Sequence, residues 1–158
     1  MKNINKIIVH CSASGPYTTY EDIDRWHCSR GWSSCGYHFV IEHKGQVRVG
    51  RPITQQGAHC YGENHDSIGI CLVGGKDGKG NLHRFSDKQL ESLELVITGI
   101  LYSLGPLDIY GHRDFNPNKE CPCFDVKEVL NCDKKKRYGF LREDAYDRAN
   151  KSLRKVQK

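Results

Sequence analysis

The sequence predicts one α/β domain, built as a central mixed β-sheet flanked by helices, with a basic helical tail after it. Three observations lead to this prediction. The chain has 158 residues, 37% of them hydrophobic and 27% charged, an ordinary composition for a single domain with one core. Short β-branched segments alternate with segments of helical periodicity, as in sheets covered by helices. Residues 133–158 differ in composition, so we expect a domain over residues 1–132 and a tail over residues 133–158.

The first predicted strand is the apolar run KIIVHC at residues 6–11, with His10 near its end. A helix follows, because Thr19 and Asp22 have the spacing of a capping box, and this helix closes at Gly31. Ile23 and Trp26 mark the face of it that we expect to be buried.

Two further segments form the middle of the predicted sheet. YHFVIE and QVRVG, at residues 37–42 and 46–50, show alternation around a turn that contains Gly45, which predicts a hairpin. SIGICLVGG, at residues 67–75, is almost continuously apolar, which is typical of a central strand covered on both faces.

The longest predicted helix starts at residues 86–89 and is stopped by the Gly-Pro pair at residues 105–106. Its apolar face is formed by Leu90, Leu93, Ile97, Ile100, Leu101 and Leu104. We then expect a strand at residues 107–111, an ordered loop, GHRDFNPNKECPCFD, at residues 111–125, and a short helix near residues 126–130. An ordered loop of this kind usually carries a functional site.

The tail carries the positive charge of the chain. The formal net charge is +5, but residues 133–158 hold ten Lys/Arg and four Asp/Glu, so the remaining residues are close to neutral. An apolar stripe at helical spacing predicts a surface helix there, formed by Leu141, Ala145, Ala149, Leu153 and Val156. We expect a solvated helix or a frayed end, and a role in binding is the alternative.

The longest apolar run, near residues 93–104, is interrupted by polar residues and too short to cross a bilayer. The N-terminal apolar run covers only residues 7–9, so we expect no signal peptide and synthesis in the cytoplasm. The eight cysteines are therefore expected to be free thiols. Several of them are interpreted as small buried hydrophobic residues, namely Cys28, Cys35, Cys60, Cys71 and Cys132.

Three residues have the chemistry of a zinc site. His10 lies at the end of the first strand, His112 follows the strand at residues 107–111, and Cys121 lies in the loop after it. Two imidazoles and one thiolate together suit Zn²⁺. Three protein ligands leave one coordination position open, as metal-assisted hydrolysis requires.

Five segments in order carry a resemblance to a known family: VHCSAS, RWHCSRGW, GYHFVIEHKGQVRVGRP, GAHCYGENHDSIGICLVGG and GHRDFNPNKECPCFD. Together, over residues 6 to about 130, they resemble the zinc-dependent N-acetylmuramoyl-L-alanine amidases, which include amidase-type phage lysozymes and peptidoglycan recognition proteins. The resemblance implies a hydrolase that cleaves the lactyl to L-alanine amide of peptidoglycan. It also implies a phage or prophage endolysin that reaches the cell wall after release.

The resemblance also implies roles for individual residues. His10, His112 and Cys121 fall on the zinc-ligand positions of the family. Tyr37 and Lys119 fall on its two catalytic positions, where a neutral donor and a fixed positive charge suit a tetrahedral oxyanion or proton transfer to the leaving amine. Which of the two handles the proton is left open.

Other positions in the same segments are assigned more loosely. His59 and Asn64 fall in a segment that helps to line the substrate groove of such enzymes. Cys123 replaces a small residue of the family pattern, and we interpret it as a bystander beside the ligand Cys121.

Two alternatives come from other functional classes. A peptidoglycan-binding module that does not cut would be signalled by loss of the cysteine ligand, and Cys121 is present. A nucleic-acid or anionic-surface binder would use the tail, but the neutral body and the scattered aromatic residues offer no continuous footprint. We therefore expect a monomer that binds muramyl peptides and no nucleic acid.

Deleting residues 133–158 tests the predicted domain boundary. Because the motifs and the core periodicity end before residue 133, the truncated chain should stay folded and should hydrolyse soluble muramyl peptides at an unchanged rate. Thermal unfolding and turnover on a soluble fragment check this expectation. An insoluble or unfolded truncated chain would make the stripe from Leu141 to Val156 part of the core.

Overall fold

The computed structural model describes residues 3–130, so the predicted tail and Cys132 lie outside the described part. Its centre is a five-stranded sheet in the order β3-β2-β4-β1-β7. Strand β4 pairs in parallel with β1 and β2, β1 pairs in parallel with β7, and only β2 and β3 are antiparallel. The prediction of a mixed sheet is confirmed. The strands are β1 (Lys6–Cys11), β2 (Phe39–Ile41), β3 (Val47–Val49), β4 (Ser67–Leu72) and β7 (Asp108–Gly111).

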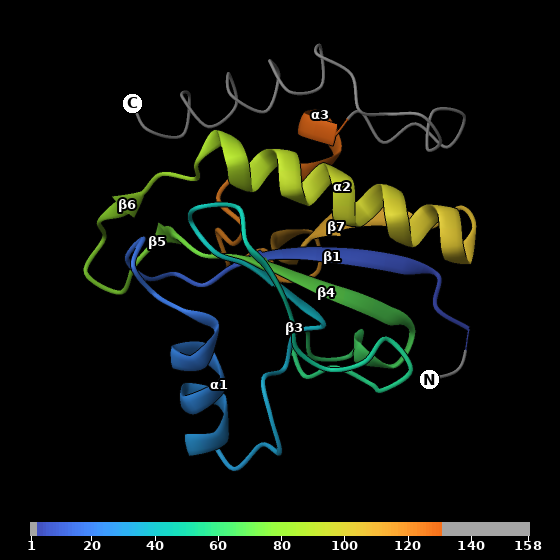
Figure 1. Ribbon diagram of the computed structural model, residues 1–158, viewed down its shortest axis with the longest axis horizontal. Coiled ribbons are helices and arrows are strands. Elements are labelled where there is room, and N and C mark those ends of the chain that lie inside the picture. Colours follow the sequence, from blue (N-terminus) through green and yellow to red (C-terminus); the bar gives the residue numbers. More distant parts are fainter. Residues whose placement is uncertain (1–2, 131–158) are drawn as a thin grey trace.

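Helices cover both faces of this sheet (Figure 1). Helix α2 (Asp87–Leu104) and the short α3 (Val126–Leu130) both contribute to the core on one face, and α1 (Tyr20–Ser29) lies on the other side. Alternate residues of β4 serve the two faces: Ile70 belongs to the large core under α2, whereas Cys71 packs with Ile23 of α1. The predicted capping box is present at Thr19, and α2 begins with a second capping box at Ser86.

The buried face of α1 differs from the prediction. Ile23 and His27 are its buried residues, whereas 42% of Trp26 is exposed. His27 is drawn inward because its Nδ1 accepts a hydrogen bond of 2.8 Å from the backbone N–H of Gly36, in the loop that follows the helix. A partner in the loop beyond the helix thus decides which of two adjacent helix positions is buried.

The central strand is shorter than predicted. Strand β4 ends at Leu72, and Gly74, with φ of 129°, turns the chain into a small hairpin of β5 (Gly75–Lys76) and β6 (Leu82–His83) that the sequence did not indicate. Every residue of β4 is buried, as expected for a strand covered on both faces.

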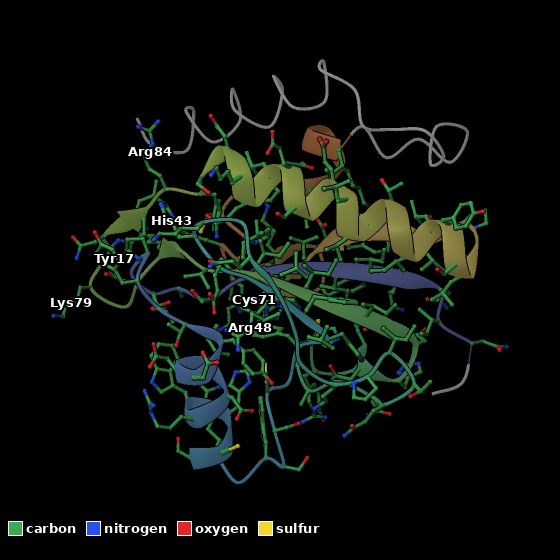
Figure 2. The ribbon with its side chains drawn as sticks, viewed as in Figure 1. Tyr17, His43, Arg48, Cys71, Lys79 and Arg84 are labelled. Carbon is green, nitrogen blue, oxygen red and sulfur yellow. The ribbon has the colours of Figure 1, made fainter. Side chains whose placement is uncertain are left out.

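The cysteines mostly follow the prediction. Cys35, Cys60 and Cys71 are buried free thiols, and Cys71 lies within the sheet layer whereas Tyr17 and Lys79 lie at the periphery (Figure 2). Cys28 is exposed, which corrects its interpretation as a buried residue, because it lies on the solvent side of the last turn of α1.

Within residues 3–130, no helix combines the length and the apolar character that a membrane span needs.

Candidate metal centre and active site

The predicted zinc ligands meet at one edge of the sheet. Strands β1 and β7 are parallel neighbours, with Val9 opposite Gly111, so His10 and His112 follow this pair side by side. Their ring centroids are 4.7 Å apart. The residues of β1 on either side of His10, Val9 and Cys11, belong to the core under α2, so alternation directs His10 to the opposite face.

The third residue reaches the site through the loop after β7. The backbone N–H of Arg113 donates a hydrogen bond of 2.8 Å to the carbonyl oxygen of Cys121, which closes the loop. The backbone N–H of Cys11 then points at the sulfur of Cys121, with 3.1 Å between N and Sγ. One ligand atom from each of His10, His112 and Cys121 lies within 4.8 Å of the other two.

These residues fit a zinc ion. Nδ1 of His10 is 3.9 Å from Sγ of Cys121. Bond lengths of about 2.0 Å to nitrogen and about 2.3 Å to sulfur in a tetrahedral site put such a pair roughly 3.6 Å apart, so little adjustment is needed. His10 is 1% exposed, and burial holds the pKa of its imidazole well below the usual range, which keeps a lone pair free for a metal.

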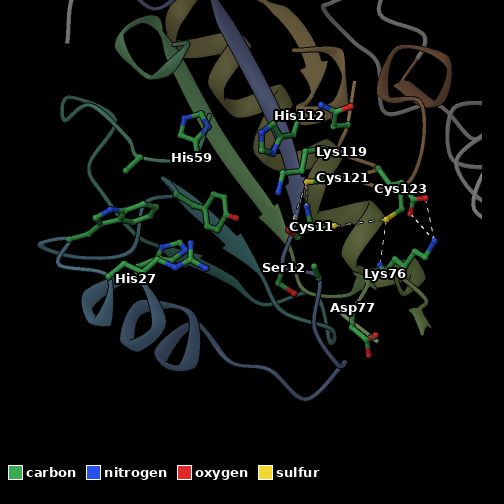
Figure 3. A pocket seen from close by; sticks show the side chains of 18 residues that line it. Cys11, Ser12, His27, His59, Lys76, Asp77, His112, Lys119, Cys121 and Cys123 are labelled. Atoms are coloured by element: carbon green, nitrogen blue, oxygen red, sulfur yellow. Dashed lines mark hydrogen bonds and ion pairs between the residues drawn. The ribbon is translucent and has the colours of Figure 1, made fainter. Parts of the chain in front are cut away.

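A cavity of about 560 Å³ opens beside the three residues, with His112, Lys119 and Cys121 on one wall (Figure 3). Tyr37 also lines it, and its ring centroid lies 5.2 Å from that of His10. Burial raises the pKa of the Tyr37 phenol well above its usual range, so the hydroxyl stays a neutral donor. The exposed Lys119 belongs to the loop that carries Cys121.

Of the two positions assigned to the substrate groove, only His59 lines the cavity. Its Nδ1 lies 2.9 Å from Nε2 of His10. Asn64 does not line the cavity: its Oδ1 accepts hydrogen bonds from the backbone N–H groups of His59 and Cys60, at 2.8 and 2.9 Å. Asn64 therefore acts on the loop that presents His59.

Residues around the end of α1 were missed as cavity residues. His27, Arg30 and Trp32 all line the cavity. Burial, and then the charges of Arg30 and Arg51, lower the pKa of His27 to about 4, so it is a neutral imidazole whose Nδ1 accepts from Gly36. The segment RWHCSRGW was part of the family resemblance. Its helical periodicity, however, predicted Trp26 rather than His27 as the residue on the buried face of the helix.

Cys123 lies apart from the three metal-capable residues. It is 5% exposed, its Sγ is 4.0 Å from that of Cys11, and it receives a contact of 3.4 Å from the backbone N–H of Lys76. The neighbouring Cys11 thiol, together with burial, raises the pKa of Cys123, so it stays a neutral thiol.

The sequence model of the N-acetylmuramoyl-L-alanine amidases matches residues 1–124. The chain belongs to this family. It is 41% identical to the endolysin of Enterobacteria phage T3 over 124 residues, which covers 77% of this chain and 82% of that one. It is 39% identical to the endolysin of Escherichia phage T7 over 129 residues, which covers 80% and 85% of the two chains.

Solved structures agree with this assignment. The N-acetylmuramoyl-L-alanine amidase LysC from Clostridium intestinale URNW superposes with a TM-score of 0.68 at 31% identity, over 76% of each chain. Bumblebee PGRP-SA superposes with a TM-score of 0.67 at 26% identity, over 77% of each chain. This member of the amidase family is a peptidoglycan hydrolase that cleaves the amide bond between N-acetylmuramoyl and L-alanine.

Replacing each of the two loop cysteines by serine, in separate variants, distinguishes their roles. Cys121→Ser should lose zinc affinity and nearly all hydrolysis, because a neutral hydroxyl replaces a soft, anionic ligand. Cys123→Ser should keep both and cost only packing stability, since its sulfur contacts Cys11 in the core. Metal content and amide hydrolysis, measured on both purified variants, check this expectation. A zinc-replete, active Cys121→Ser beside a metal-free Cys123→Ser would reverse the assignment.

Proposed function

We propose that the enzyme is a zinc amidase in which His10, His112 and Cys121 hold the metal. The observation that carries the proposal is the convergence of their ligand atoms to within 4.8 Å beside the cavity. When bound, zinc would supply Lewis acidity toward the amide carbonyl and would make hydroxide available from water near neutral pH.

The remaining roles fall to side chains around the same cavity. Tyr37, held neutral by burial, offers a hydrogen bond to the oxygen that gains charge as the carbonyl becomes tetrahedral. Lys119 offers a positive charge to the same oxygen or a proton to the leaving amine. Within the described part of the chain no ion pair engages the Lys119 ammonium, which leaves it available to substrate.

We further propose that the enzyme serves as an endolysin, which acts on the cell wall after release from the cytoplasm. The phage relatives that carry this name match along most of their length, which supports this role. The proposed metal ligands lie together beside one cavity, so the proposal needs no residue from a second copy of the chain.

Metal removal tests the zinc proposal. The purified protein should carry about one zinc per chain, chelation should abolish hydrolysis, and added zinc should restore it. Mass spectrometry of purified peptidoglycan after incubation should find free lactyl carboxyls and peptides with new L-alanine amino termini. Full activity after verified removal of all metal would contradict the proposal.

Replacing Lys119 tests its proposed charge. Lys119→Ala should keep zinc but lose on the order of a hundredfold or more in turnover, the usual loss when a group aimed at an oxyanion is removed. Lys79→Ala is the control, because Lys79 is an exposed lysine of the β5–β6 turn that does not line the cavity. Equal turnover of both variants would return Lys119 to the role of a solvated loop charge.

A further inference from the structure

We propose that His59 is a positioning residue that holds His10 in the orientation and tautomer required for binding zinc through Nδ1. The inference rests on the proposed zinc site and extends it by naming the group behind a ligand. It also gives His59 a role different from the substrate lining that its position in the sequence suggested.

The two nitrogens of His10 face different partners. Nδ1 lies 3.9 Å from Sγ of Cys121, on the side of the metal-capable group, and Nε2 lies 2.9 Å from Nδ1 of His59. The two imidazoles meet edge to face, with an interplanar angle of 85° and centroids 5.0 Å apart. If Nδ1 binds the metal, Nε2 carries the proton of the neutral ring and donates it to His59.

Donation from His10 to His59 is consistent with the hydrogen bonds that His59 and Ser67 make in turn. A neutral His59 that accepts at Nδ1 carries its own proton on Nε2, which lies 3.4 Å from Oγ of Ser67. Ser67 can accept there, because its hydroxyl proton is already donated to the carbonyl oxygen of Glu63, at 2.6 Å. The chain from His10 through His59 and Ser67 therefore ends on a backbone acceptor with every proton placed once.

The surrounding backbone is shaped to hold the His59 ring. Oδ1 of Asn64 accepts a hydrogen bond from the backbone N–H of His59, which fixes the backbone at this position. A Cβ atom added at Gly69, in the middle of β4, would lie 2.5 Å from the ring, and one added at Gly57 would also lie 2.5 Å from it. Glycine at these two positions leaves the space that the imidazole fills.

The same contacts argue against His59 as a substrate ligand. Both of its nitrogens face protein groups, one at His10 and the other at Ser67, so neither is left for a muramyl peptide. Its place in the cavity wall then follows from its position behind His10 rather than from contact with substrate.

Substitution of His59 tests the inference through metal binding. His59→Phe keeps a ring but removes the acceptor, and zinc affinity measured by competition with a chromogenic chelator should fall about 10- to 100-fold. His59→Asn should recover most of this loss, because the Oδ1 of asparagine stands where Nδ1 of the imidazole stood. In cobalt-substituted protein, the visible absorption bands should shift in His59→Phe and return toward the original spectrum in His59→Asn.

His38 offers a matched control. It is fully buried next to His59, with ring centroids 5.8 Å apart, but its nitrogens contact Gly69 N–H and the carbonyl oxygen of Gln55 instead of His10. His38→Phe should lower the melting temperature and leave the zinc affinity of the folded protein unchanged. Equal zinc affinities for His59→Phe and the unchanged enzyme, or equal losses in His59→Phe and His38→Phe, would overturn the inference. An unchanged enzyme that binds no zinc would instead refute the proposed function.

The unchanged, zinc-loaded enzyme provides a measurement that does not depend on folding of a variant. Nitrogen-15 NMR of labelled imidazoles should find a proton on Nε2 of His10 and an unprotonated Nδ1 on His59. Zinc bound through Nε2 of His10 would overturn the inference, because His59 would then have nothing to accept.

Discussion

The site depends on the parallel pairing of β1 with β7. These strands are about a hundred residues apart in sequence, and their register sets Val9 beside Gly111. Because parallel strands end at the same edge of the sheet, this one register brings His10, near the end of β1, beside His112, the first residue after β7. A slip by one residue would turn His10 into the core under α2, so the packing that fixes the register also fixes the ligand geometry.

The third residue of the site, Cys121, is positioned differently. It lies in a loop, and its position depends on hydrogen bonds from the backbone N–H groups of Arg113 and Cys11. The sulfur thus accepts from the strand that carries His10, which couples loop and sheet. The contacts of Cys121 with Cys11 and His10 join residues more than a hundred positions apart, so the site depends on long-range pairing of the chain.

Local patterns predicted the elements well. The capping box at Thr19, the helix start at residues 86–89 and the apolar segment around β4 are short-range signals with one dominant physical cause each, and all three are confirmed. The misplaced features depend on partners outside the element itself. His27 is buried by a hydrogen bond from the loop beyond its own helix, and β4 ends before Gly74, whose backbone N–H donates to Oγ of Ser12.

The site follows the same division. Residue chemistry and family resemblance suggested His10, His112 and Cys121 as one set, and the fold brings them together. Asn64 could not be placed from sequence, since a side chain that serves a substrate and one that caps a neighbouring backbone have the same composition and spacing. Only the contacts with the N–H groups of His59 and Cys60 reveal which it does.

Burial has opposite consequences for the imidazoles and the phenol of this cavity, and both suit hydrolysis. Removing water lowers the pKa of His10 and brings that of His59 to about 3, so both rings are neutral and can coordinate or accept. The same desolvation raises the pKa of Tyr37, so the phenol keeps its proton for donation. With zinc bound as proposed, the Cys121 thiolate would cancel only one of its two charges. The neutral histidines would add none, and together with the nearby Lys119 the remaining positive charge would favour an oxyanion formed at the mouth of the cavity.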